Sequence, residues 1–209
     1  MSAGVKSSDN PTSHTLLGLQ VSTLGWNAAL AHAQELALSQ GKPATIAFLD
    51  EAKFAGLLLG RGGDDRHHLL LPAGGKFLRL LLKFIWRKRP FEAAFTSAGF
   101  TSALLTYFAA PRRVGLVGDD RSRAEALCTH FARHAPWHEF VAITPDTSLS
   151  GRLDLVIAEA AVADRHMERR LEGLDIGLVI MAGRGLHGLA RPLPVSTGTQ
   201  PSISKPSLA

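Results

Sequence analysis

The sequence predicts a single α/β domain with a Rossmann-like, mostly parallel sheet and helices on both faces. Short apolar runs that suit buried strands alternate along the chain with segments whose Ala and Leu recur at helical spacing. Of the 209 residues, 45% are hydrophobic, which is enough for a full core. The run RRVGLVGDDRSRAEALCTHF, residues 112–131, places a strand, a tight glycine turn and a helix start in succession.

The N-terminal part begins with residues 1–13, which are polar and rich in serine, so we expect them to be disordered before a folded domain over 14–190. A short apolar run predicts a strand over 16–21. Ala and Leu at helical spacing then predict a helix over 27–39, which ends before Gly41-Lys42-Pro43. The next segment, ATIAFL, has the continuous apolar pattern of a buried strand, residues 44–49.

The middle of the chain continues this alternation of strands and helices. The four residues Pro72-Ala73-Gly74-Gly75 are typical of the end of a strand, and Pro111 is typical of the segment that follows a helix. The pattern predicts helices over residues 51–59, 76–89 and 97–108, a glycine-rich polar loop over 60–65 and a strand over 68–71.

The C-terminal part has the same pattern and ends in a tail, residues 191–209, that is rich in Pro, Ser and Thr and is expected to be disordered. Before the tail, apolar runs predict strands, and the segments between them have helical spacing. The predicted strands cover residues 114–117, 140–144, 154–158 and 176–181, and a predicted helix covers 160–171.

The turn Gly118-Asp119-Asp120 is the strongest candidate for a ligand site. In an open parallel sheet, ligands bind at the carboxyl ends of the strands, and the N–H groups of a helix start favour an anion such as a diphosphate. The alternative is an ordinary turn between a strand and a helix. Because two carboxylates repel a diphosphate, we expect binding to be weak or to need a divalent cation, Mg²⁺ or Mn²⁺. The predicted nucleotide-sugar site consists of Gly115, Gly118, Asp119, Asp120 and Ser122.

Acid/base chemistry would need a carboxylate near the sheet ends, and the candidates are Asp50 and Asp120, with Asp119 and Glu159 nearby in the same kind of position. Asp50 directly follows the predicted strand 44–49, where a catalytic carboxylate would lie. The alternative is that Asp50 caps the helix that follows, because Asp is a favoured N-cap residue.

Residues 76–89 predict an apolar helix with a basic face. Lys76, Arg79, Lys83 and Arg87 recur every three or four residues, and Lys88 and Arg89 extend the cluster. Such a helix suits an anionic membrane surface, and the alternative is a core-packed helix with a solvated basic stripe.

The net charge of +5 also favours phosphate-bearing partners, among which we expect no nucleic acid. No apolar run approaches the roughly 20 residues that span a bilayer. With one cysteine, Cys128, no internal disulfide can form, which favours a reducing compartment. We therefore expect a cytoplasmic protein, peripheral at the inner face of the plasma membrane where it meets lipid.

The histidine-rich stretch after Cys128 raises the question of a metal site. Cys128, His130, His134 and His138 form a regular series, but Pro136 interrupts the helix before the last histidine and no strict zinc spacing is met. We therefore predict no metal site there. The pair His67-His68 is expected to mark the start of a strand.

The order of segments resembles the WecG/TagA/CpsF glycosyltransferase family over about residues 16–189. The family moves an N-acetylmannosamine-type sugar from UDP to a polyprenyl-diphosphate-linked acceptor. RRVGLVGDDRSRAEAL, residues 112–127, is similar to the family's nucleotide-sugar segment. LLLPAGG, residues 69–75, is similar to its P-D-G-I-G segment, and IAFLD, residues 46–50, is similar to its second strand.

The departures from the family pattern bear on catalysis. The resemblance implies that the family's catalytic Asp falls on Ala73, which cannot take a proton, and that a Gly-Thr-Asp motif falls on Ser97-Ala98-Gly99. It therefore implies a catalytically impaired accessory or regulatory subunit of surface polysaccharide synthesis, acting as a homo-oligomer or with a pathway partner. It also implies that residues 72–75 and 118–120 border one cleft.

Two alternatives remain. One is an active glycosyltransferase that uses Asp50 or Asp120 as its base. The other is a membrane-surface adaptor that uses residues 76–89.

Overall fold

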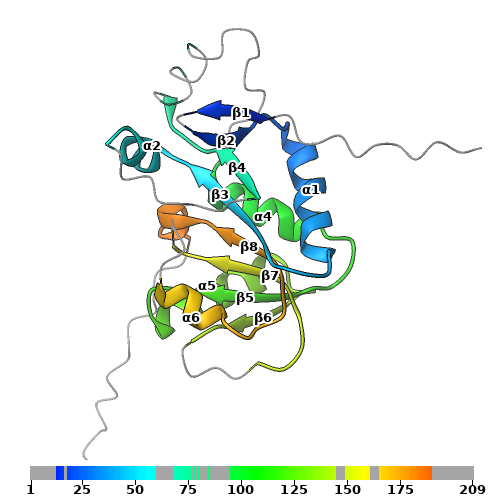
Figure 1. The fold of residues 1–209 in the computed structure, drawn as a ribbon. Coiled ribbons are helices and arrows are strands. Elements are labelled where there is room, and N and C mark those ends of the chain that lie inside the picture. Colours follow the sequence, from blue (N-terminus) through cyan, green and yellow to red (C-terminus); the bar gives the residue numbers. More distant parts are fainter. Residues whose placement is uncertain are drawn as a thin grey trace, which may run out of the picture.

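The computed structural model describes most of the chain. It covers residues 13–16, 18–59, 68–76, 78, 80, 84, 95–144, 149–160 and 165–189. Within these residues the protein is a central parallel sheet with helices on both faces and a small hairpin beside it (Figure 1).

The central sheet has six strands, and every neighbouring pair is parallel. The order across the sheet is β4-β3-β8-β7-β5-β6, so the predicted Rossmann-like α/β fold is confirmed. The strands are short apolar segments, as expected where helices cover both faces. Their bounds are β3 Ala44–Leu49, β4 Leu69–Pro72, β5 Arg113–Val117, β6 Glu139–Ala142, β7 Leu153–Ala158 and β8 Ile176–Met181.

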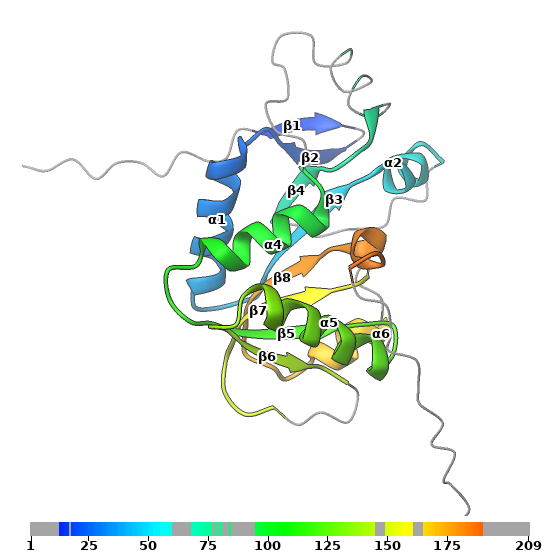
Figure 2. The same cartoon turned by 180° about the vertical axis from the view of Figure 1, so that it is seen from behind.

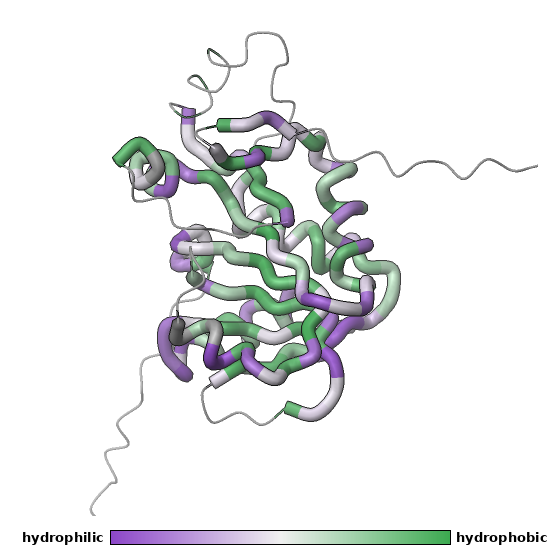
Figure 3. The backbone as a smooth tube through the Cα atoms, viewed as in Figure 1, coloured by the Kyte–Doolittle hydropathy of each residue, from purple (hydrophilic) through white to green (hydrophobic). Residues whose placement is uncertain are grey.

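The two faces of the sheet carry separate hydrophobic cores. One core is covered by α1 (Trp26–Leu38), α4 (Ser97–Tyr107) and α5 (Arg121–His134), which lie together in Figure 2. The other is covered by α2 (Glu51–Leu58), α6 (Arg165–Leu171) and the N-terminal hairpin. Alternate residues of each strand face the two cores, and Figure 3 shows the hydrophobic residues concentrated along the sheet.

The N-terminal hairpin corrects the sequence-based expectation of one strand over 16–21. The structure has two antiparallel strands, β1 (Ser13–Leu16) and β2 (Leu19–Ser22). Gly18 has a φ of 87°, a left-handed conformation that glycine adopts without strain, and it turns the chain back. Leu16 and Val21 are buried in the second core, so the hairpin covers part of the sheet. Ordered structure therefore includes Ser13, which was expected to be disordered.

Most other predicted elements are found with small shifts in their ends. The strand expected at 140–144 is β6, residues 139–142, and the described part of the helix expected at 160–171 is α6. His68 lies at the entry to β4, as predicted, where its Nδ1 accepts a hydrogen bond from the backbone N–H of Thr45 over 3.0 Å. Of the predicted 76–89 helix, only residues 76, 78, 80 and 84 are described, and segments 1–12 and 190–209 lie outside the described chain.

The connections after β5 and β7 diverge. The chain leaves β5 toward β6 on one side, whereas it leaves β7 toward β8 on the other, although β5 and β7 are hydrogen-bonded neighbours. Such a divergence opens a crevice outside the carboxyl ends of the two strands, which is the usual ligand position in open α/β sheets. Gly118 follows β5 and Glu159 follows β7, so both lie at this switch point.

Candidate ligand site at the carboxyl edge of the sheet

The turn after β5 is held tightly against α5. A Cβ at Gly118 would lie 2.7 Å from the backbone nitrogen of Ala124 and 3.0 Å from the carbonyl carbon of Arg123. Only glycine allows the strand end and the helix start to approach this closely. The turn also receives a bond from the opposite face of the sheet, because Arg170 of α6 donates from Nη1 to the Gly118 carbonyl oxygen over 2.8 Å.

Asp120 is the N-cap residue of α5. Its Oδ1 accepts a hydrogen bond from the backbone N–H of Arg123 over 2.7 Å, and its carbonyl oxygen accepts from Ala124 N–H over 3.0 Å. An N-cap aspartate satisfies one of the N–H groups that a bound anion would otherwise use. The helix start is therefore already partly occupied by a carboxylate of the chain itself.

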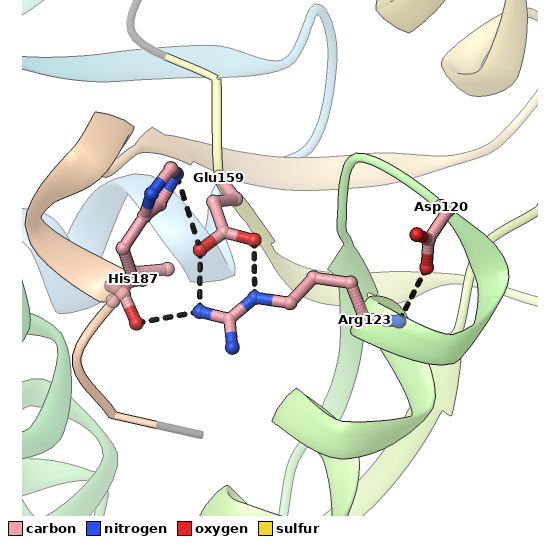
Figure 4. A network of polar contacts seen from close by, with 5 residues as sticks. Asp120, Arg123, Glu159 and His187 are labelled. Carbon is pink, nitrogen blue, oxygen red and sulfur yellow. Dashed lines mark hydrogen bonds and ion pairs between the residues drawn. The ribbon is translucent and has the colours of Figure 1, made fainter. Parts of the chain in front are cut away.

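The side chains of Arg123 and Glu159 form a two-point ion pair at the switch point (Figure 4). Arg123 donates from Nε to Oε2 over 2.7 Å and from Nη2 to Oε1 over 2.5 Å. The Glu159 side chain is 1% exposed and that of Arg123 is 12% exposed. The hydrogen bond to Glu159 raises the pKa of Arg123, burial opposes it, and the charges of Glu159, Asp119 and Asp120 add to the rise.

Arg123 also forms a hydrogen bond to the turn after β8. This turn, η1 (Gly183–Leu186), receives a hydrogen bond from Arg123 Nη2 to the Leu186 carbonyl oxygen over 2.7 Å. The next residue, His187, lies on the opposite side of the Glu159 carboxylate from Arg123 (Figure 4). Its Nε2 is 3.6 Å from Glu159 Oε1, and its side chain is 51% exposed. Residues from the segments that follow β5, β7 and β8 thus meet at one point.

Asp119 completes a group of three metal-ligating side chains. One ligand atom from each of Asp119, Glu159 and His187 lies within 4.8 Å of the others, and no second group of this kind occurs in the described part of the chain. Asp119 and His187 are exposed, whereas Glu159 is buried. The group therefore has one fixed member and two members that face solvent.

Comparison with known proteins does not assign this site. No protein-family profile matches the chain, and no curated protein is significantly similar to it. The relation to the WecG/TagA/CpsF glycosyltransferases therefore stays a prediction from the quoted segments, and the geometry of the described residues carries the functional argument.

The predicted nucleotide-sugar residues occupy two environments. Gly118, Asp119, Asp120 and Ser122 lie at the turn and the first turn of α5, as expected. Gly115 lies inside β5, where a Cβ would meet Ile143 Cδ1 at 2.5 Å and Leu153 Cδ1 at 3.1 Å. Gly115 therefore serves close packing of the sheet against the second core rather than the candidate site.

The two candidate bases both act as helix caps. Asp50 Oδ1 accepts a hydrogen bond from Lys53 N–H over 2.7 Å at the start of α2, and Asp120 has the equivalent role at α5. The alternative proposed for Asp50, a capping role, thus matches its contacts. One oxygen of each carboxylate is therefore already engaged by a backbone N–H.

Ala73 and Gly118 share the carboxyl edge of the sheet but are not neighbours. Ala73 follows β4 at one end of the strand order, and its N–H donates to the Leu49 carbonyl oxygen. The ends of β3, β8 and β7 lie between it and the turn after β5. Four strand spacings correspond to about 19 Å. The expectation that residues 72–75 and 118–120 border one cleft is therefore not supported by the strand order.

In the Cys128–His138 series, the last histidine is engaged by the backbone. His138 accepts a hydrogen bond from Arg112 N–H at Nδ1 over 2.9 Å, and its Nε2 is 2.7 Å from the Leu105 carbonyl oxygen. Nε2 must therefore carry the proton, and both ring nitrogens are engaged by backbone. Burial raises the pKa of the Cys128 thiol to about 11, with Glu125 adding to the rise.

The predicted basic membrane face lies mostly outside the described residues. Lys76 is described and exposed, whereas Arg79, Lys83, Arg87, Lys88 and Arg89 are not described. None of the described helices has the length and hydrophobicity needed to cross a bilayer.

Sequence reasoning identified Glu159 only as one of several acidic residues and missed Arg123, Arg170 and His187. Glu159 carries a local signal, because it directly follows the buried strand LDLVIA. Arg123, Arg170 and His187 have no such local signal. Only the strand order brings α6 and the turn after β8 to the end of β5.

Proposed function

We propose that this protein binds the diphosphate of a nucleotide sugar at the start of α5. It acts as a catalytically impaired relative of the WecG/TagA/CpsF glycosyltransferases and serves as an accessory or regulatory subunit in surface polysaccharide synthesis. The observation that carries the proposal is the position of Gly118-Asp119-Asp120 at the switch point between β5 and β7.

The electrostatics of the turn support an anionic ligand that arrives with a cation. Arg123 and Arg170 bring guanidinium groups to the turn from opposite faces of the sheet. The carboxylates of Asp119 and Asp120 oppose this attraction, because they repel phosphate oxygens. A diphosphate therefore binds well only with a divalent cation beside it.

Impaired catalysis is supported by the state of the carboxylates along this edge. Asp50 and Asp120 are caps, Glu159 is paired with Arg123, and Ala73 has no carboxylate. Loss of a general base lowers a rate by about 10²–10⁴-fold. Binding without efficient turnover is the property expected of an accessory subunit.

Calorimetry with UDP, with and without Mn²⁺, tests the binding. The most informative variant is Arg121→Pro, because proline suits the first position of a helix and removes one N–H of the helix start. Arg121→Ala is the matched control, since it removes the same side chain but keeps that N–H. We expect Arg121→Pro to weaken UDP binding about tenfold more than Arg121→Ala. Equal affinities, or no UDP binding by the unaltered protein, would contradict the proposal.

Turnover separates the impaired protein from an active glycosyltransferase. The assay is UDP release from UDP-N-acetylmannosamine in the presence of a polyprenyl-diphosphate-linked acceptor. We expect no release above the background rate. Efficient release that Asp50→Ala or Asp120→Asn abolishes would establish the active enzyme instead.

A membrane-surface adaptor is the second candidate, supported by exposed apolar side chains. Leu58 and Leu59 at the end of α2, and Leu80 and Phe84 further along the chain, are each more than 60% exposed. Together with the basic residues of the 76–89 sequence they suit an anionic bilayer surface. Co-sedimentation with anionic but not with neutral vesicles is the expected result, and equal binding to both would remove this candidate.

A further inference from the structure

We propose that Asp119, Glu159 and His187 form a binding site for a divalent transition-metal ion such as Mn²⁺ at the switch point. The three side chains come from the connections after β5, β7 and β8, which the strand order brings together at the carboxyl edge of the sheet. Nothing in the sequence spacing of these residues indicates a metal motif. The site exists only in the folded protein.

The separation of two of the ligands already suits a common ion. His187 Nε2 and Glu159 Oε1 are 3.6 Å apart. Two ligands bound to Zn²⁺ at about 2.0–2.2 Å in tetrahedral geometry lie roughly 3.3–3.6 Å apart, and neighbouring ligands of an octahedral ion such as Mn²⁺ lie slightly closer together. Asp119 is exposed on a turn, and its carboxylate lies within 4.8 Å of the other two ligand atoms. In the proposed site Asp119 moves closer to these two atoms and becomes the third ligand.

Arg123 positions the buried ligand. Its guanidinium group binds both Glu159 oxygens from the side opposite His187, which fixes the carboxylate and leaves Oε1 facing the imidazole (Figure 4). Carboxylates that bind metals are commonly held by such an outer hydrogen bond. Arg123 also offsets the charge of one carboxylate, so it limits affinity for the free ion.

The charge of the assembled site explains why an anion would bind once the metal ion is in place. The carboxylates of Asp119, Asp120 and Glu159 contribute −3. Arg123 and Arg170 contribute +2 and the ion +2, so the loaded site with its neighbours carries a net charge of +1. Its position beside the first turn of α5 then favours a diphosphate, a role that rests on the proposed function. The metal site itself does not depend on that role.

The donor set selects the kind of ion. Two carboxylate oxygens and one imidazole nitrogen suit Mn²⁺ or Zn²⁺ better than Mg²⁺, because Mg²⁺ prefers oxygen ligands and retains water. Mn²⁺ is the best probe, since its paramagnetism reports binding directly.

The test is titration of Mn²⁺ into the full chain without nucleotide, followed by calorimetry and by the loss of the free-ion electron paramagnetic resonance signal. We expect Asp119→Asn and His187→Ala each to weaken Mn²⁺ binding more than about tenfold. Both residues are exposed, so the variants should keep the thermal stability of the parent. The matched controls are Asp175→Asn, at the amino edge of the sheet, and His32→Ala on α1, which should retain the parent affinity.

Absence of Mn²⁺ binding, or binding that neither Asp119→Asn nor His187→Ala weakens, would overturn the metal site. Repeating the titrations with UDP separates this result from the proposed function. Mn²⁺ binding without UDP binding would keep the metal site and remove the nucleotide role. Weak UDP binding without Mn²⁺ binding would keep the nucleotide role and remove the metal site, whereas tight UDP binding in EDTA would contradict the need for a cation.

Discussion

Arg123 and Glu159, 36 residues apart in the sequence, hold each other through two hydrogen bonds at the point where the connections of the sheet diverge. Glu159 brings the only side chain of the metal group that is buried, and Arg123 also binds the carbonyl oxygen of Leu186. One guanidinium group therefore joins α5, the end of β7 and the turn after β8. This pair is the structural basis of the candidate site.

Loss of Arg123 should be much more costly than loss of an exposed arginine on the same helix. Arg123→Met leaves the Glu159 carboxylate buried without its partner, which we expect to lower the free energy of unfolding by about 3 kcal/mol. Arg121→Met removes an exposed pair with Glu125 and should change it by less than about 1 kcal/mol. Denaturant titration measures both, and equal effects would show that the Arg123–Glu159 pair adds little.

Gly118→Ala should disturb the start of α5. The added methyl group would lie 2.7 Å from the Ala124 backbone nitrogen, where no flexible side chain can move aside. Overpacking of this kind costs about 1–3 kcal/mol. Gly188→Ala is the matched control, because its Cβ would meet no atom within 4 Å. Thermal melting compares the two variants, and similar melting temperatures would mean that the turn after β5 relaxes without cost.

His138 should be important for stability because both of its ring nitrogens contact backbone groups. It is 7% exposed and bridges the backbone of Arg112 and Leu105, so His138→Ala leaves the partly buried Arg112 N–H and the Leu105 carbonyl oxygen without this partner. We expect a loss of about 2 kcal/mol or more in the free energy of unfolding. His134→Ala, which removes a more exposed contact with the Ser102 carbonyl oxygen, should cost less. The reverse order of effects would refute the bridging role.

The thiol of Cys128 should be unreactive in the folded protein. Burial raises its pKa from an ordinary value of 9.0 to about 11, so at pH 8 the thiolate fraction falls about 100-fold relative to the unfolded chain. Iodoacetamide labelling with and without denaturant measures this ratio. Equal labelling rates would contradict it.

The same shift in the Cys128 pKa fixes the sign of a pH effect on stability. Because the folded pKa is raised, the neutral thiol stabilises the fold fully below pH 9, and this contribution is lost as the pH rises toward 11. Cys128→Ala should flatten the decline in unfolding free energy over that window. If the unfolding free energy of Cys128→Ala declines over this pH range as steeply as that of the parent, groups other than Cys128 cause the decline.

The elements of the fold could be predicted from local pattern, because each strand is a short apolar run followed by a turn. ATIAFL and LDLVIA became β3 and β7 for this reason. The N-terminal hairpin was missed because its two strands together resemble one apolar run. The glycine at position 18, between the two strands, was the only local sign of a turn, and in the structure it is left-handed.

The candidate site was less predictable, because its contacts depend on strand order. The capping role of Asp120 follows from its place before α5, and it could be inferred locally. The pairing of Arg123 with Glu159, and the approach of His187, require β7 to lie beside β5 and β8 beside β7. Residue spacing contains no information about that order.

The central position of β8 has a consequence for the synthesis of the chain. β8 follows the other five strands of the sheet in the sequence, yet it lies between β3 and β7 and is the strand through which β3-β4 pairs with β7-β5-β6. While the ribosome is still translating residues before 176, the chain lacks the strand that pairs with both β3 and β7. Closure of the sheet must therefore wait until β8 leaves the exit tunnel.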